Sequence, residues 1–207
     1  MKILEYGNNK AQIVLIQMIA EHDLKTMESE IDYIHERTDE DFLLKAFMVE
    51  NWNDDLSPWK APAVFGKEDF GGGAEETLKK VLKSCDDRNK TYYIGGYSLA
   101  GLFSLWSAYQ TDVFSGVAAA SPSIWFPGFT EYMSEQKICC DNVYLSLGDK
   151  EANTRNPVMA SVAQKIRVAN ELFQEQNINT ILEWNEGNHF RDYDLRTAKA
   201  FAWICRC

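Results

Sequence analysis

The chain has 207 residues, of which 45% are hydrophobic and 25% charged, and its formal net charge is −10. This length allows one well-buried core and is short for two, so we expect a single domain over residues 1–207. The excess of acids repels phosphate backbones and anionic membrane surfaces, which argues against nucleic acid and membranes as partners.

The hydrophobic pattern alternates between short runs typical of strands and longer amphipathic stretches typical of helices. In chain order it predicts a strand at 11–20, a helix at 24–37, a strand at 42–49, a loop at 51–73, a helix at 74–85, a strand at 92–95, a helix at 99–109, strands at 116–120 and 143–147, a helix at 157–174, a strand at 180–184 and a helix at 195–203. This alternation predicts an α/β protein whose mostly parallel sheet carries helices on both faces.

Sheets of this kind bind ligands at the carboxyl ends of their strands. Four connections are expected to leave from those ends: one after Ala20, one from Asn51, the turn at Ser98, and segment 121–127. We therefore look for chemistry in these four connections.

The turn at Ser98 carries the sharpest motif, Gly-Tyr-Ser-Leu-Ala-Gly at 96–101, between a predicted strand and a predicted helix. In a nucleophile elbow the serine occupies a strained strand-to-helix turn, so the residues two before and two after it must be small. Gly96 and Ala100 meet this requirement. A serine that only caps the helix is the alternative, but the flanking elements favour a nucleophile.

A serine hydroxyl is a weak nucleophile and needs a base within hydrogen-bond reach. Of the three histidines, only His189 follows Ser98, directly after the last predicted strand, and its loop can return over the serine. His35 lies in a charged helix and fits a solvated surface group, whereas His22 follows a strand end and can line the site. We expect His189 to be the general base.

The imidazole in turn needs a carboxylate that fixes its tautomer. Asp149 and Glu151 both follow the strand predicted at 143–147, and either acid can serve. Asp149 also suits an ordinary turn, because Gly-Asp is common turn chemistry.

These motifs resemble those of an esterase family of α/β hydrolases that includes esterase D, the enterochelin-type esterases and the mycolyltransferase antigens. The resemblance extends over most of the chain and is carried by residues 95–101, 114–125, 145–151 and 187–190. It implies an α/β-hydrolase fold and ester cleavage by a Ser–acid–His arrangement. The chain departs from the family in two ways: its short length leaves little room for a lid domain, and Ala100 replaces a family glycine.

We favour Glu151 over Asp149 as the acid. In this fold the acid commonly stands at the fourth position of Gly-x-x-Asp/Glu after its strand, which is Glu151 here. Its longer side chain also extends the reach toward the loop of His189. A strand end misplaced by two residues would exchange the two acids, so Asp149 remains the alternative.

The remaining site residues are predicted more coarsely. The Leu99 N–H, at the start of a helix, is expected to bind an oxyanion, with backbone near Ile19 and Ala20 as the second donor. Aromatic residues in the loops at the ligand side suit an acyl or aromatic group, or alternatively pin long loops to the domain. These are Trp52, Trp59, Trp125 and Phe126.

The N-terminus and the cysteines indicate the compartment. No apolar leader follows Met1, and the apolar run at 11–20 is too short to cross a bilayer, so we expect a cytoplasmic protein. The five cysteines are accordingly expected to be reduced thiols that bind no metal.

Together these features predict a serine hydrolase that cleaves a carboxylic ester or thioester of a small molecule without a cofactor. Two other functions remain open: acyl transfer to an alcohol instead of water, and a catalytically silent module that keeps the fold and the pocket. The substrate and the oligomeric state cannot be read from the sequence.

Overall fold

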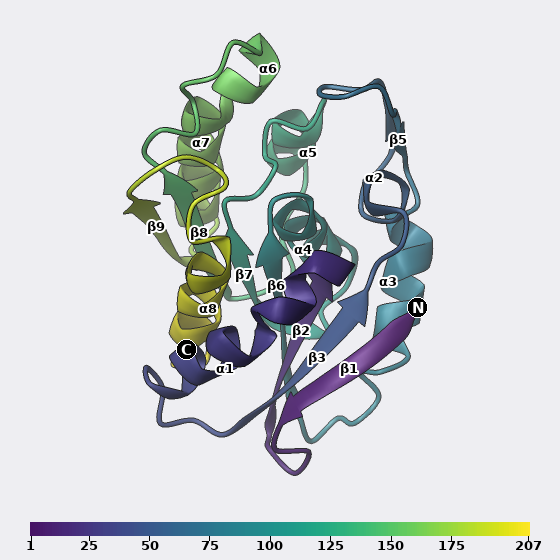
Figure 1. Ribbon diagram of the computed structural model, residues 1–207, viewed down its shortest axis with the longest axis vertical. Coiled ribbons are helices and arrows are strands. Elements are labelled where there is room, and N and C mark those ends of the chain that lie inside the picture. The colour runs from purple at the N-terminus through teal and green to yellow at the C-terminus, as the bar shows by residue number, and fades with distance from the viewer.

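The computed structural model describes residues 1–207 and is built on a seven-stranded sheet (Figure 1). The strand order is β1-β3-β2-β6-β7-β8-β9, in which β1 runs antiparallel to β3 and every other neighbouring pair is parallel. The strands are β1 (Lys2–Gly7), β2 (Ile13–Ile19), β3 (Phe42–Met48), β6 (Thr91–Tyr97), β7 (Phe114–Ala120), β8 (Asn142–Gly148) and β9 (Asn179–Asn185). The mostly parallel α/β sheet predicted from the sequence is thus confirmed.

Helices and one short hairpin make up the rest of the regular structure. The helices are the 3-10 helix η1 (Glu21–Lys25) and the α-helices α1 (Met27–His35), α2 (Trp52–Asp55), α3 (Ala74–Leu82), α4 (Leu99–Gln110), α5 (Phe129–Glu135), α6 (Pro157–Ala160), α7 (Val162–Glu175) and α8 (Tyr193–Ile204). The hairpin pairs β4 (Lys60–Ala61) with β5 (Phe70–Gly71). None of the helices combines the length and the apolar character that crossing a bilayer requires.

Helices cover both faces of the sheet. On one face α1 and α8 lie side by side (Figure 1), and Leu15 of β2 shares a buried cluster there with Met27 of α1 and Phe201 of α8. On the other face α3, α4 and α7 contribute to a larger core, which includes Leu78, Phe103 and Phe173.

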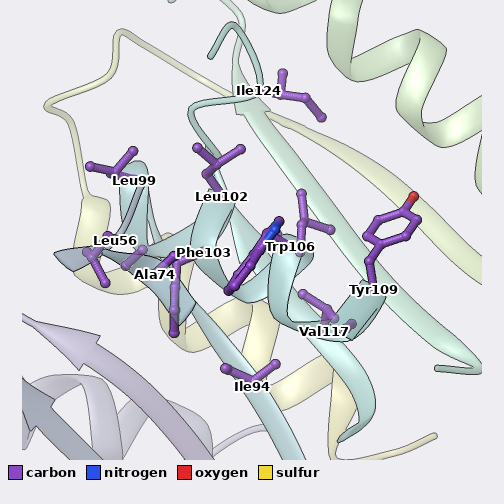
Figure 2. Close-up of a cluster of buried hydrophobic side chains, with 14 of the residues drawn as sticks. Leu56, Ala74, Ile94, Leu99, Leu102, Phe103, Trp106, Tyr109, Val117 and Ile124 are labelled. Carbon is purple, nitrogen blue, oxygen red and sulfur yellow. The ribbon is translucent and has the colours of Figure 1, made fainter. Parts of the chain in front are cut away.

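Helix α4 is buried along nearly its whole length. All of its residues except the last are buried, which is typical of a helix that is apolar on every side. Figure 2 shows Leu102, Phe103 and Trp106 of α4 in a cluster with Ile94 of β6 and Val117 of β7. This packing holds the first turn of α4 in a fixed position at the end of β6.

Gly95 lets α8 approach the centre of the sheet. A Cβ atom at this position would lie 2.6 Å from the Ala118 carbonyl oxygen and 2.8 Å from Phe201 Cε1. Both contacts are too short for a real side chain, so close approach of two elements requires glycine here.

The structure adds elements that the hydrophobic pattern does not reveal. Strand β1 lies at the sheet edge and is largely exposed, so it lacks an apolar run. The segment 51–73 contains α2 and the hairpin as well as loops, and α5 follows the segment 121–127. The helices predicted at 24–37 and 157–174 are each divided in two.

Candidate active site

Ser98 occupies a sharp turn between β6 and α4. Its backbone angles are φ 57° and ψ −121°, a combination that is strained for any residue with a side chain. A Cβ atom on Gly96 would lie 2.7 Å from the Cβ of Ala100, so the turn requires small residues at these two positions. The strand–turn–helix geometry is that expected of a nucleophile elbow.

The Ser98 hydroxyl forms a hydrogen bond with a histidine. Ser98 Oγ lies 2.9 Å from His189 Nε2, and it also lies 3.3 Å from the Ser123 hydroxyl. His189 belongs to the loop between β9 and α8, which returns over the end of β6. The structure thus brings together the two residues that the motif and the chain order indicated.

Glu151 lies behind His189 and is almost completely buried. His189 Nδ1 is 2.7 Å from Glu151 Oε2, and the Glu151 side chain is 4% exposed. The other carboxylate oxygen, Oε1, accepts hydrogen bonds from the Ser121 hydroxyl at 2.7 Å and the Gly148 N–H at 2.7 Å. Since Oε1 is occupied, Oε2 is left to face the imidazole.

Asp149 does not approach the imidazole. Its carboxylate accepts a hydrogen bond from the Gly187 N–H at 2.7 Å, while its own N–H donates to the Asn185 carbonyl at 2.8 Å. These bonds join the loop after β8 to the loop after β9. Of the two candidate acids, the structure places Glu151 at His189 and gives Asp149 a structural position.

An arginine that the sequence did not indicate completes this group. Arg196 of α8 is 2% exposed, and its Nη1 donates to Glu151 Oε1 at 3.0 Å and to the Tyr97 hydroxyl at 3.1 Å. Tyr97 in turn donates to the His189 carbonyl at 2.8 Å. Burial, together with the Glu151 charge, raises the pKa of Tyr97 to about 12, which keeps this hydroxyl a donor.

The two predicted sources of an oxyanion donor differ in the structure. Leu99 is the first residue of α4, so its N–H has no acceptor in a preceding turn and remains available beside Ser98. The N–H of Ala20 instead donates to Asp23 Oδ2 at 2.8 Å, because Asp23 folds back onto the start of η1. Ile19 is fully buried at the end of β2. The Ala20 N–H is therefore already engaged, whereas a second oxyanion donor near Ile19 stays a prediction.

A cavity of about 430 Å³ opens beside Ser98 and His189. Trp52 lines it, as predicted, and so does His22, which lies 3.2 Å from the Asp23 carboxylate. Phe190, next to the histidine, also lines the cavity and is 83% exposed.

The other three aromatic rings proposed as pocket walls lie elsewhere, which corrects that expectation. Trp125 and Phe126 are buried, and Phe126 packs edge-on against Phe70 with ring centres 5.0 Å apart. The Trp59 indole N–H donates to the Pro127 carbonyl at 3.0 Å. These rings pin the loops to the core, because burying large aromatic surface stabilises the fold more than leaving it at a cavity wall.

The cysteines lie away from this site and carry free thiols. Burial raises the pKa of Cys140 and of Cys205 to about 12, so both remain protonated near neutral pH. No group of three or more His, Cys, Asp or Glu side chains is arranged to hold a metal ion.

Comparisons with solved structures identify the fold. An IroE-like serine hydrolase from Shewanella oneidensis superimposes with a TM-score of 0.77 at 12% identity, over 99% of this chain and 75% of that one. The siderophore hydrolase EstA from Aspergillus nidulans gives 0.66 at 16% identity, over 97% and 85%. The enterobactin and salmochelin hydrolase IroE gives 0.67 at 14% identity, over 98% and 88%. The chain has the α/β-hydrolase fold.

At these identities the likeness concerns the fold, and no family model or curated protein sequence matches the chain. The α/β-hydrolase fold was expected from the resemblance noted in the sequence, and the absence of a large lid domain was expected from the short length of the chain. In this fold the serine elbow follows a central strand. Here that strand is β6, the fourth of the seven in the sheet.

Proposed function

We propose that the protein is a serine esterase, which cleaves a carboxylic ester of a small molecule with Ser98 as nucleophile. The observation that carries this proposal is the unbroken hydrogen-bonded path from Ser98 Oγ to His189 Nε2 and from His189 Nδ1 to Glu151 Oε2. Its outer end opens into the cavity beside α8. A serine that only capped a helix would need neither the strained turn nor the histidine.

In the first half of the proposed reaction, Ser98 becomes acylated. His189 Nε2 accepts the hydroxyl proton as Oγ bonds to the ester carbonyl carbon, and the carbonyl electrons move onto oxygen. The Leu99 N–H, at the positive end of α4, stabilises this oxyanion. When the tetrahedral species collapses, the bond to the alcohol breaks and His189 returns the proton to the leaving oxygen.

The second half repeats these steps with water. His189 removes a proton from water, whose oxygen bonds to the acyl carbon, and the collapse of the second tetrahedral species releases the acid and restores the Ser98 hydroxyl. Substrate, water and the three side chains account for every proton and electron pair in this scheme.

Glu151 orients the imidazole and stabilises its charge. Its Oε2 accepts the Nδ1 proton of His189, which leaves the lone pair of Nε2 directed at Ser98. Burial of the carboxylate strengthens this effect, because electrostatic interactions are less screened away from water.

The substrate is proposed to be a small molecule that the cavity can enclose. A volume of about 430 Å³ lies within the range of small-molecule sites. Of the structurally similar proteins, one is named a siderophore hydrolase and another an enterobactin and salmochelin hydrolase. This favours an ester on a polar molecule with several functional groups over an acylglycerol.

Labelling with a fluorophosphonate tests the proposal, because this probe reacts with activated serines and hardly at all with others. The wild-type protein should be labelled and should hydrolyse p-nitrophenyl acetate, and Ser98→Ala should lose both properties. Ser123→Ala is the matched control. The Ser123 hydroxyl lies 3.3 Å from Ser98 Oγ but should not itself react with the probe, so this variant should still be labelled at Ser98. A folded wild type that stays unlabelled would favour a silent binding module instead.

A further inference from the structure

Two polar side chains line the cavity at positions where apolar residues are expected. Gln17 lies on the same face of β2 as Leu15 and Ile19, because side chains alternate along a strand, and both neighbours belong to the core beneath α1 and α8. Glu30 lies close to one turn after the buried Met27 on the inner side of α1. Gln17 and Glu30 therefore interrupt two apolar surfaces where these meet at the cavity.

Both side chains are buried, and each has one oxygen atom without a hydrogen-bond partner. Gln17 is 5% exposed and Glu30 is 3% exposed, and the Oε1 atom of each is buried without a hydrogen bond. Buried polar atoms in proteins are nearly always paired, and an unpaired one destabilises the fold. Because both residues line the cavity, a ligand bound there can supply the missing donors.

The charges around Glu30 show which kind of donor fits. Burial raises its pKa well above the usual range; a hydrogen bond from Gln17 acts in the opposite direction, and the charges of Asp23 on η1 and Asp194 on α8 raise the pKa further. Lys25 and His22 also line the cavity, but both are exposed at its rim. The field at the buried end therefore favours a cationic group over an anionic one.

We propose that Gln17 and Glu30 form a subsite for an ammonium group carried by the substrate. An ammonium has three N–H donors, enough for both unpaired oxygens, and its charge stabilises the ionised carboxylate that burial disfavours. A hydroxyl offers a single donor and a carboxylate offers none. The inference rests on the proposed function where it assigns the ammonium to an ester, whereas the binding itself depends on Gln17 and Glu30.

The register of the sheet sets the distance between the subsite and the nucleophile. Gln17 pairs with Gly95 of the parallel strand β6, which precedes Ser98 by three residues. At a rise of about 3.3 Å per residue, the subsite lies roughly 10 Å from the nucleophile along the strands. The ammonium is therefore expected at the end of an extended alkyl arm.

Binding of n-hexylammonium, n-hexanol and hexanoate to the purified protein tests the subsite, with thermal shift and NMR titration as readouts independent of activity. Hexylammonium should bind roughly 10-fold more tightly than hexanol, because hydrogen bonds to charged groups are the stronger ones, and hexanoate should bind most weakly. Glu30→Gln keeps the shape and removes the charge, so it should abolish this difference. Glu28→Gln, which alters an exposed acid of the same helix, is the matched control and should preserve it.

A second variant tests the subsite even if Glu30→Gln fails to fold. Gln17→Leu removes the other unpaired acceptor, and it should weaken the binding of hexylammonium more than that of hexanol. Equal affinities of the three probes for the wild type would overturn the subsite, as would an ammonium preference that survives both substitutions.

Fluorophosphonate labelling separates the subsite from the ester function. Hexylammonium should slow the labelling of Ser98, because the ammonium compound and the fluorophosphonate would occupy the same cavity. Tight binding that leaves the labelling rate unchanged would place the ammonium elsewhere and overturn the proposal. Glu30-dependent binding to a protein whose Ser98 is never labelled would instead refute the esterase function and leave the subsite standing.

Discussion

Arg196 Nη1 lies 3.0 Å from Glu151 Oε1, and the two side chains are 2% and 4% exposed. A buried ion pair gains little net stability over an apolar pair, because both ions lose their hydration. Its main effect here is on position. Arg196, Ser121 and the Gly148 N–H all bind Oε1, which leaves Oε2 for the imidazole of His189.

The two acids of the loop after β8 should respond differently to removal of their charge. Glu151→Gln is expected to lower turnover by roughly 10⁴-fold, because the imidazole loses the partner that fixes its tautomer. Asp149→Asn should leave turnover near the wild-type value and reduce the free energy of unfolding by about 1 kcal/mol, since it weakens the bond from the Gly187 N–H. Steady-state kinetics and urea denaturation of both variants measure these effects. A large loss of turnover in Asp149→Asn alone would exchange the two assignments.

Substitutions at Arg196 and Glu151 should separate the stability of the protein from its activity. Arg196→Met leaves Glu151 buried without its cation, so the free energy of unfolding should fall by about 3–5 kcal/mol. The double variant Arg196→Met/Glu151→Leu removes both charges and should recover much of that stability while remaining inactive. Thermal denaturation and turnover, measured together, test this; a double variant less stable than either single variant would contradict it.

The serine elbow was predictable from sequence because its requirements are local. A serine between small residues, at the junction of a strand and a helix, is visible without tertiary information. His189 followed from chain order, and Glu151 from its spacing after a strand and its longer side chain. Each of these inferences used neighbouring residues or the order of elements.

Arg196 and the aromatic rings required tertiary information. Arg196 meets Glu151 across 45 residues of sequence, and a single arginine in a terminal helix resembles any surface cation. Tryptophan in a polar loop is compatible with both a cavity wall and a core anchor, so only packing distinguishes Trp52 from Trp59. Burial of Glu30 was equally hidden, because its helix also carries exposed acids.

Strain at Ser98 predicts a gain in stability when the side chain is removed entirely. Glycine adopts positive φ without steric penalty, whereas Ser98 holds φ 57° with a Cβ atom present. Ser98→Gly should therefore raise the free energy of unfolding by about 1 kcal/mol, net of the greater flexibility of the unfolded glycine chain. Ser98→Ala, which keeps the Cβ atom, should melt close to the wild type. If both variants melt at the wild-type temperature, the turn is not strained.

Glu30 should make the stability of the protein depend on pH in a definite direction. Burial raises the pKa of Glu30 well above its usual range in the folded protein, while in the unfolded chain it takes the ordinary value of about 4.3. At a pH between the unfolded pKa and the higher folded pKa, Glu30 is protonated in the folded protein and ionised in the unfolded chain. The free energy of unfolding therefore falls as the pH rises through this window. Glu30→Gln removes this titration.

The free energy of unfolding of Glu30→Gln should therefore exceed that of the wild type by a margin that grows as the pH rises above the ordinary glutamate pKa of about 4.3. Asp23, Asp194, Lys25 and His22, the charged groups near Glu30, are present in both proteins, so most of their own titration cancels in the difference. Glu28→Gln serves as the control, because an exposed glutamate on the same helix should give a margin that does not change with pH. Urea denaturation across the pH range measures all three proteins, and parallel curves for Glu30→Gln and the wild type would show that Glu30 titrates normally in the folded state.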